Sequence, residues 1–254
     1  MKITQILFLI VLKSAFSHAQ EVDTLIENIY RQNLQQEQKL MQMSDYLFKQ
    51  RIDFIKKDGD GDIDEQSQRE FVVYVRPPDQ QKRILIKARD YADGEWQDIT
   101  EKRRSGRHKG EGNKFSLNEI FNPEARKNYL FNYQGVEWVD GHHSERIQVT
   151  ALEAGENRFN GELWFARGEL DLVKAILSPS ELPGSVDSMQ MVFDMQKVNG
   201  YWVPKHIEMR AEISFLFFFS GIIESDILFY DYQFNQQFPD SIFDAGTQMN
   251  QTTK

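Results

Sequence analysis

After its first forty residues, the chain is dominated by alternating apolar and polar positions, a two-residue period typical of β-strands. Residues 187–219 show this period most clearly, because the odd-numbered positions on both sides of Asn199-Gly200 are mostly apolar. Side chains at such spacing lie on one face of a sheet. The predicted strands are 46–57, 69–76, 84–89, 129–139, 142–152, 159–165, 170–177, 186–198, 201–219 and 222–234.

A helical pattern precedes the strands. From Glu21 to about Met43, apolar residues recur every three or four positions between Glu, Gln and Arg, which predicts one long helix with a narrow apolar face. Tight turns between the strands indicate antiparallel pairing, and there is no alternation of strands and helices that would favour a parallel sheet. The expected fold is mainly β, with about ten antiparallel strands and one long helix.

The turn at Asn199-Gly200 sets the register of two strands. A two-residue loop would place Met191 opposite Glu208 and mix the two faces of the sheet. An odd-length loop, with Gly200 in the left-handed position of a bulge, pairs odd positions with odd positions. We therefore predict the odd-length loop, in which the methionines of the first strand meet Val203, Ile207 and Met209.

The first nineteen residues have the features of a secretory signal peptide. Lys2 is followed by an apolar run over 6–12, too short to span a membrane, and Ser17 and Ala19 are small residues at a cleavage-site spacing. We expect cleavage after Ala19 and an exported, soluble, periplasmic protein. The rest is expected to be a single domain over 20–238 and a flexible tail over 239–254.

The chain contains no cysteine, which excludes disulfides, thiolate chemistry and attachment of lipid to a cysteine. Loss of Lys2 and Lys13 with the signal peptide changes the net charge from −9 to −11. Such a charge argues against nucleic acid or an anionic membrane as a nonspecific partner. This acidic chain contains one basic cluster, which includes Arg103, Arg104 and Arg107. The cluster either contacts an anionic headgroup or a partner, or is a solvated loop.

Two patterns suggest metal binding, but neither has the residue spacing that a metal site requires. The acidic stretch over 56–65 resembles a calcium loop, but no register places the required residues and glycine together, so we predict an acidic hairpin turn. Weak cation binding over 58–65 is left open. His142 and His143 follow a type I′ turn at Asp140-Gly141 that pairs Val139 with His142. Adjacent strand residues point to opposite faces, so no metal site is predicted.

No nucleophile elbow, phosphate-binding loop or metalloprotease helix occurs in the sequence, so we expect neither an enzyme nor a cofactor. The informative feature is the methionine-rich apolar face, because methionine is common on surfaces that accept varied partners. The face is either an ordinary core or the lining of a lipid cavity. The predicted lining is Met189, Met191, Phe193, Met195, Ile207, Met209, Phe215 and Phe217, and Leu25 and Ile29 are predicted in a helical lid.

The second half of the chain resembles the LolA/LolB-like outer-membrane lipoprotein-sorting family. The similar segments are YLFNYQGVEWVDGHHSERIQV with its Asp-Gly turn, FNGELWFARGELDLVKAIL, VNGYWVPKHIEMRAEI and YDYQFN. The resemblance extends over about residues 21–236. It implies a curved, incomplete antiparallel β-barrel whose concave face is covered by the N-terminal amphipathic helix.

The same resemblance implies a function. The expected protein is a soluble periplasmic carrier that holds lipid or the acyl chains of a lipoprotein and has a transfer partner at the inner or outer membrane. The chain itself is not expected to span a membrane. The alternative is a non-catalytic envelope interaction or assembly protein, in which the apolar face is a filled core.

Overall fold

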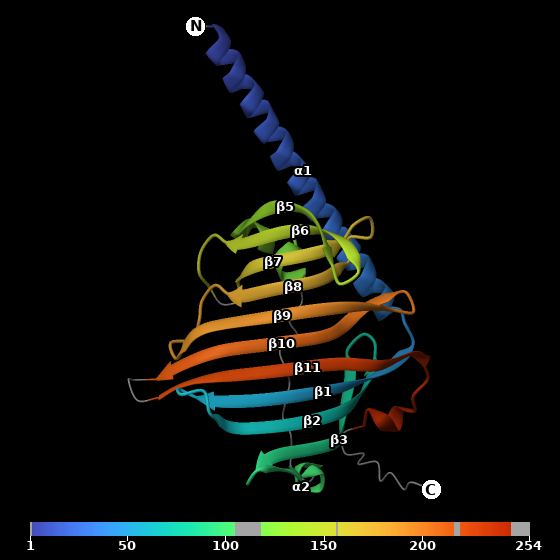
Figure 1. The fold of residues 1–254 in the computed structure, drawn as a ribbon. Helices are drawn as coiled ribbons and strands as arrows, with labels where there is room; N and C mark the ends of the chain where they lie inside the picture. Colours follow the sequence, from blue (N-terminus) through green and yellow to red (C-terminus); the bar gives the residue numbers. More distant parts are fainter. Residues whose placement is uncertain (1, 105–117, 156, 216–218, 245–254) are drawn as a thin grey trace. The chain divides into compact units, whose positions relative to one another are not determined.

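The structure is a computed structural model that describes residues 2–104, 118–155, 157–215 and 219–244. Its strands form one open sheet of eleven strands in the order β4-β3-β2-β1-β11-β10-β9-β8-β7-β6-β5 (Figure 1). The mainly β, unclosed antiparallel fold is therefore confirmed, with the short strand β4 added to those predicted. The elements are α1 (Lys2–Met41), β1 (Asp45–Asp58), β2 (Ile63–Arg76), β3 (Gln80–Ala92), β4 (Glu95–Asp98), α2 (Thr100–Arg104), α3 (Asn118–Phe121), η1 (Ala125–Asn128), β5 (Tyr129–Val139), β6 (His142–Ala151), β7 (Phe159–Ala166), β8 (Leu172–Pro179), β9 (Val186–Val198), β10 (Tyr201–Phe215), β11 (Phe219–Gln236) and η2 (Asp240–Ile242).

The chain divides into two compact units, and the single domain predicted over 20–238 stays a prediction. Unit 1 comprises residues 1–36 and 112–181, and unit 2 comprises residues 37–111 and 182–254. Unit 1 therefore contains most of α1 and strands β5 to β8. Unit 2 contains the other seven strands and the hairpin with the methionine-rich face.

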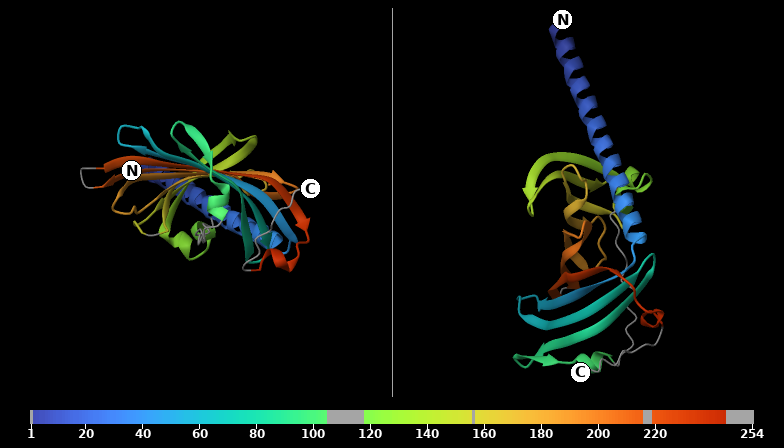
Figure 2. Two further views of the ribbon diagram at one scale, coloured as in Figure 1. Left: turned by 90° about the horizontal axis from the view of Figure 1, so that it is seen from below. Right: turned by 90° about the vertical axis from the view of Figure 1, so that its right-hand side faces the viewer.

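In unit 1 the helix packs on strands β5 to β8 (Figure 2). Ile29 is fully buried, as are Phe121 and Phe165, whose rings meet edge to face with centroids 5.5 Å apart. Polar contacts fix the helix as well, because the amide of Gln32 donates to the buried carboxylate of Asp171 at 3.3 Å. The predicted covering of a sheet face by the N-terminal helix is thus confirmed in unit 1.

In unit 2 the chain after the helix joins a small apolar core. Met43 packs with Val203 and Phe234. The C-terminal segment also packs here, since Asp240–Ile242 forms η2 and Ile242 is buried. The flexible tail predicted over 239–254 stays a prediction, and residues 245–254 lie outside the described part of the chain.

A charged clamp attaches this segment to the sheet. Arg76 donates through Nε to Asp45 Oδ1 at 3.1 Å and through Nη2 to Asp45 Oδ2 at 2.9 Å. The backbone N–H of Phe238 donates to the same carboxylate at 3.0 Å. These bonds, that from Arg76 foremost, lower the pKa of Asp45. A lowered pKa stabilises the fold above the ordinary aspartate pKa of about 4, and this contribution is lost as the pH falls through the folded pKa.

We expect Asp45→Asn to lower the free energy of unfolding at pH 7 by about 1–3 kcal/mol, the range for hydrogen bonds to charged groups. The difference from the wild type should shrink as the pH falls from about 4 through the lowered pKa of Asp45, because the wild-type carboxylate becomes protonated over that range. Urea unfolding at pH 7 and pH 3 measures both values. Asp240→Asn is the control, because that side chain is 93% exposed and its bond to Arg76 is a surface contact. An equal loss for Asp45→Asn at both pH values would contradict the electrostatic account.

The turn at Asn199-Gly200 differs from the prediction. Val198 pairs directly with Tyr201, and both turn residues have positive φ, 51° at Asn199 and 85° at Gly200. These values describe a two-residue type I′ turn, so the predicted odd-length loop is wrong. Val203 accordingly lies opposite Gln196 and not opposite a methionine.

A bulge further along β10 restores the predicted register, in which the apolar residues of β9 and β10 share one face of the sheet. The register shifts between Pro204 and His206, which leaves Lys205 as the extra residue. Beyond it, Met191 lies opposite Met209 and Phe193 opposite Ile207, as predicted. Proline has no N–H to donate, so a bulge is one of the few places where a strand accepts it.

Gly200→Ala should test the turn. An alanine at φ 85° meets no nearby atom, so its cost is that of the left-handed backbone, about 1–2 kcal/mol in the free energy of unfolding. Urea denaturation measures the loss. Gly184→Ala is the matched control, because nothing lies within 4 Å of its added Cβ either and its φ is outside the left-handed range. Equal effects of the two changes would argue against the type I′ turn.

Two other predicted turns are confirmed. Val139 pairs with His142 across Asp140-Gly141, whose φ values are 48° and 83°. The acidic stretch is the hairpin turn between β1 and β2, and Asp58 Oδ1 accepts the backbone N–H groups of Asp60 and Asp62 at 3.0 and 2.9 Å. The Asp58 carboxylate is thus used to close the turn.

Candidate functional site

The predicted lining residues of β9 and β10 lie together on one face of unit 2. Alternate residues of β9 point to this face, and the pairing sets Met191 beside Met209, Phe193 beside Ile207 and Met189 beside Ala211. The side chains of Phe215 and Phe217 lie outside the described part of the structure, so their predicted role stays a prediction.

The same face continues across two more strands that the prediction did not include. Ile227 of β11 lies opposite Ile207 on one side and opposite Ile52 of β1 on the other. The ring of Phe48 lies 5.8 Å from that of Phe229. We call the whole surface the apolar face, and it consists of Met189, Met191, Phe193, Met195, Ile207, Met209, Ile223, Ile227, Phe229, Phe48, Ile52 and Phe54.

The apolar face differs from the core of unit 1 in its burial. Each of its side chains is only half-buried. Among the described residues, the largest fully buried side chains belong to unit 1, with the exception of Val73. Close packing is the norm in a protein core, so a broad half-buried apolar surface has room for further contacts.

Aromatic rings close one end of the apolar face. Tyr232 stacks on Phe48 at 5.2 Å and on Phe234 at 5.8 Å, and its hydroxyl donates to the carbonyl of Pro204 at 2.8 Å. Burial raises the pKa of Tyr232, so its hydroxyl is neutral at physiological pH. This end of the face is apolar and uncharged.

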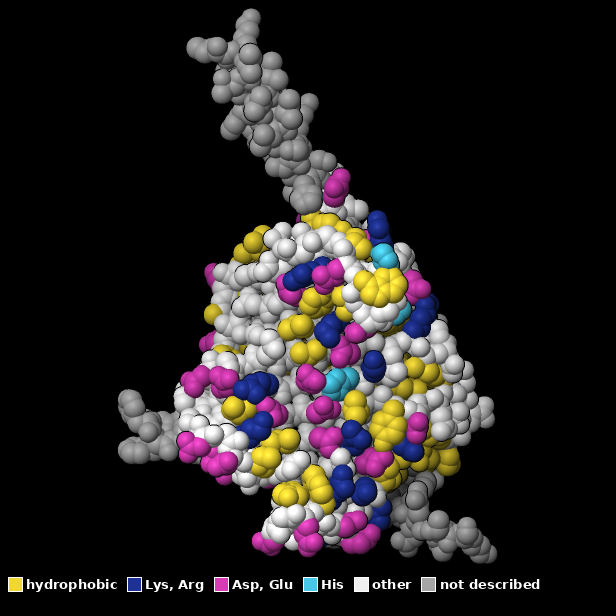
Figure 3. Space-filling view, in the orientation of Figure 1, with side chains coloured by type: hydrophobic (Ala, Val, Ile, Leu, Met, Phe, Trp, Pro, Cys, Tyr) yellow, Lys and Arg dark blue, Asp and Glu magenta, His cyan; other side chains and the backbone are white. Residues whose placement is uncertain are grey.

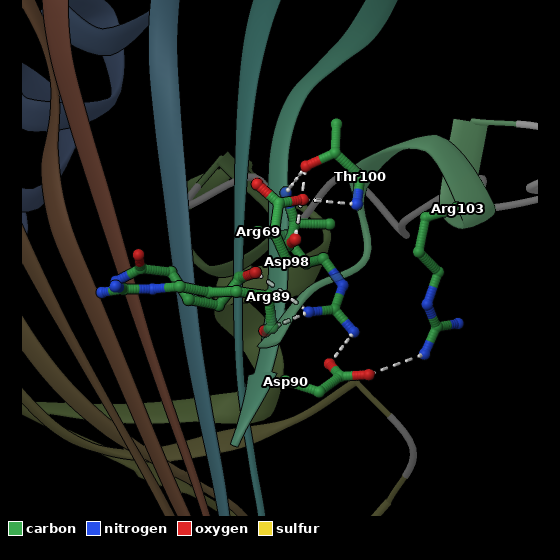
Figure 4. A network of polar contacts seen from close by, with 8 residues as sticks. Arg69, Arg89, Asp90, Asp98, Thr100 and Arg103 are labelled. Atoms are coloured by element: carbon green, nitrogen blue, oxygen red, sulfur yellow. Dashed lines mark hydrogen bonds and ion pairs between the residues drawn. The ribbon is translucent and has the colours of Figure 1, made fainter. Parts of the chain in front are cut away.

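A polar network lies beside the apolar face on β2 and β3 (Figure 4). Arg69, which pairs with Ile52 across the ladder, donates to Asp90 at 2.6 Å and to the carbonyl of Arg89 at 2.8 Å. Arg103 of α2 reaches the other oxygen of Asp90 at 3.8 Å. Arg69 carries no signal in the sequence, because its partners come from a neighbouring strand and not from its own segment.

The predicted basic cluster is only partly described. Arg103 is 44% exposed and contacts Asp90, so it is available to a further anion. Arg104 donates to the carbonyls of Leu85 and Ile86 at 3.2 and 3.3 Å, which anchors α2 to β3. Arg107 lies beyond the described residues. Arg104 is thus held by two backbone carbonyls and Arg103 only by its longer contact with Asp90, and a headgroup role for either arginine stays a prediction.

The predicted lid residues belong to unit 1. Leu25 is half-buried, and Ile29 is fully buried in the core of that unit. Arg126 supports the same helix with a 2.7 Å ion pair to Glu27, whose pKa it lowers. The observed contacts of Ile29 are thus structural, and a lid role for Leu25 and Ile29 stays a prediction.

Comparison with known proteins gives structural neighbours only. No family model and no curated protein matches the sequence. A DUF1329 family protein from Desulfovibrio piger is 16% identical, with 86% of this chain and 97% of that chain covered and a TM-score of 0.39. A putative outer membrane lipoprotein-sorting protein domain from Vibrio parahaemolyticus is 12% identical, with 84% and 94% covered and a TM-score of 0.36. A LolA superfamily protein from Nitrosomonas europaea is 13% identical, with 85% and 97% covered and a TM-score of 0.33.

In the part of the chain that the structure describes, no helix is both long enough and apolar enough to cross a membrane.

Proposed function

We propose that the chain is a carrier that binds lipid, or the acyl chains of a lipoprotein, on the apolar face of unit 2. The observation behind this proposal is that twelve apolar side chains from four neighbouring strands share one face and stay half-buried. An acyl chain laid on them would gain about 0.8 kcal/mol for each methylene removed from water. The methionines suit this role, because their flexible side chains adapt to ligands of varied shape.

The proposal includes export and a charged contact. The signal-like first nineteen residues support cleavage after Ala19 and a periplasmic location, and a carrier there requires a donor or acceptor at the inner or outer membrane. Arg103 would contact an anionic headgroup or such a partner, since its guanidinium is exposed beside the Arg69–Asp90 pair. The proposed carrier is non-catalytic and has no cofactor.

Photo-crosslinking tests where the ligand lies. A fatty acid with a diazirine near its methyl end is bound to the full chain, irradiated, and mapped by peptide mass spectrometry. We expect labels on 189–195 of β9 and 207–213 of β10, with competition by unlabelled fatty acid. Labels confined to exposed apolar residues elsewhere, such as Trp138 or Leu152, would contradict the proposal.

A second candidate function is an envelope interaction or assembly protein. It is favoured by the edge strand β5, which exposes Trp138 to 65% and Leu130 to 59% of their surface. Exposed apolar side chains on an unpaired edge are suited to a protein partner. In that case, Trp138→Ala would abolish partner capture and leave fatty-acid binding unchanged, whereas changes in the apolar face would have the opposite effects.

A further inference from the structure

Four titratable side chains meet on the opposite face of the same strands. His206 of β10 lies across the ladder from Asp194 of β9, and Glu208 of β10 lies across from Asp226 of β11. In the space-filling view, acidic side chains gather around a histidine near the middle of the visible face (Figure 3). Because strand residues alternate between faces, this cluster is separated from the apolar face by the sheet itself.

Three of these groups converge as metal ligands do. The ligand atoms of His206, Glu208 and Asp226 all lie within 4.8 Å of one another. His206 Nε2 is 3.0 Å from Asp226 Oδ1 and 3.8 Å from Glu208 Oε1. Two ligands at about 2.0–2.1 Å from a tetrahedral zinc ion are roughly 3.3 Å apart, a value between these two distances.

The contact between His206 and Asp226 is not an ordinary hydrogen bond. Both His206 Nε2 and Asp226 Oδ1 are buried, and neither has a hydrogen-bond partner although they lie 3.0 Å apart. Buried polar atoms that form no hydrogen bond are costly. An ion held by both atoms would satisfy them together.

The charges at the site also favour a bound cation. Glu208 and Asp226 are carboxylates directly opposite each other on adjacent strands, an arrangement that destabilises a sheet. The nearest arginine on β10, Arg210, is bound to Glu224 at 2.6 Å and to Glu212 at 3.4 Å. A bound cation would offset the repulsion between the two opposed carboxylates.

The fourth residue occupies the position of a supporting group. Asp194 Oδ2 lies 3.4 Å from His206 Nδ1, the ring nitrogen turned away from the other two carboxylates. Histidines that bind a metal through one nitrogen commonly donate the other N–H to a carboxylate, which fixes the tautomer and the ring orientation. Asp194 is thus a positioning residue.

We propose that His206, Glu208 and Asp226 bind a divalent transition-metal ion, with zinc as the best match, and that Asp194 orients the imidazole. One nitrogen and two carboxylate oxygens suit zinc better than calcium or magnesium, which take six or more oxygen ligands. Glu208 is 57% and Asp226 47% exposed, so a water molecule can complete the coordination. The site does not depend on the proposed lipid carriage.

Calorimetric titration of zinc chloride into the untagged, chelator-treated full chain tests the proposal. We expect one ion per chain. His206→Ala and Asp226→Asn should each weaken binding by about 100-fold or more, and Asp194→Asn by about 10–100-fold with the stoichiometry unchanged. His143→Ala is the matched control, an exposed histidine in unit 1 that should have no effect.

The possible outcomes separate clearly. Absence of zinc binding to the wild type overturns the proposal, and so does binding that persists in His206→Ala or is lost equally in His143→Ala. An unchanged affinity in Asp194→Asn overturns the positioning role alone. If circular dichroism shows that His206→Ala is unfolded, Asp226→Asn decides the question, because its half-exposed side chain tolerates the nearly isosteric change.

Discussion

The double substitution Met191→Asp and Met209→Asp should abolish acyl-chain binding while the protein stays folded. The two side chains lie directly opposite each other in the middle of the apolar face. An acyl chain laid over them would cover two carboxylates that water now solvates, and burying an uncompensated charge is strongly unfavourable. We expect the affinity for a long-chain fatty acid to fall by about 100-fold or more, close to 3 kcal/mol, in a fluorescent-probe displacement assay.

The control is Gln190→Asp, which places a carboxylate on the same strand but on the opposite, exposed face. It should leave the affinity within about twofold, since it faces away from the ligand. If repulsion between the two aspartates unfolds the double variant, Met191→Asn with Met209→Asn provides uncharged polar groups at the same positions. Full binding by a folded double variant would show that the acyl chain lies elsewhere.

Ile29→Ala should have the largest effect on stability. Ile29 is completely buried within the core of unit 1, and removing a large aliphatic side chain from such a site costs about 2–5 kcal/mol in the free energy of unfolding. Much of this cost comes from the cavity, which the close-packed neighbours fill only in part. Chemical denaturation followed by circular dichroism measures it.

Leu25→Ala is the comparison on the same helix. Leu25 is half-buried, so its truncation exposes less apolar surface and should cost about 1 kcal/mol or less. A larger loss in the free energy of unfolding for Ile29→Ala than for Leu25→Ala would show that Ile29 makes a structural contact and that Leu25 contributes little to stability. A cost below about 1 kcal/mol for Ile29→Ala would mean that the helix does not pack on unit 1 as described.

Strands and most turns could be predicted from the sequence because they depend on local patterns. The two-residue period located ten of the eleven strands, and β5 and β9 begin and end where predicted. The strand β4 was missed, because four residues are too few to show a period. The turn at Asp140-Gly141 was found for the same local reason, since both positions favour a positive φ.

The hairpin at Asn199-Gly200 shows where local reasoning fails. The apolar residues of the two strands do face one another, as predicted, and this register needs one unpaired residue in the hairpin. The apolar pattern does not determine whether that residue lies in the turn or in a bulge within a strand. The structure places it at Lys205, next to Pro204, and keeps the tight turn. The proline was the available clue, because a strand interior accepts it mainly at a bulge.

The polar sites could not be predicted because their members meet only through strand pairing. His206 lies far in sequence from the other histidines, yet Asp194 and Asp226 reach it from two neighbouring strands. Arg69 and Asp90 meet in the same way. Once the register of β9, β10 and β11 is known, the partners of His206 follow directly from the ladder.

Native mass spectrometry of the full chain, purified from the compartment in which it matures and then extracted for lipid, tests the central claim most directly. The account predicts a stoichiometric lipid or acylated peptide on the wild type, and its loss from the variant that carries Met191→Asp and Met209→Asp. A protein mass without ligand that takes up neither added fatty acid nor phospholipid would contradict the account, and the apolar face would then be a partly exposed core.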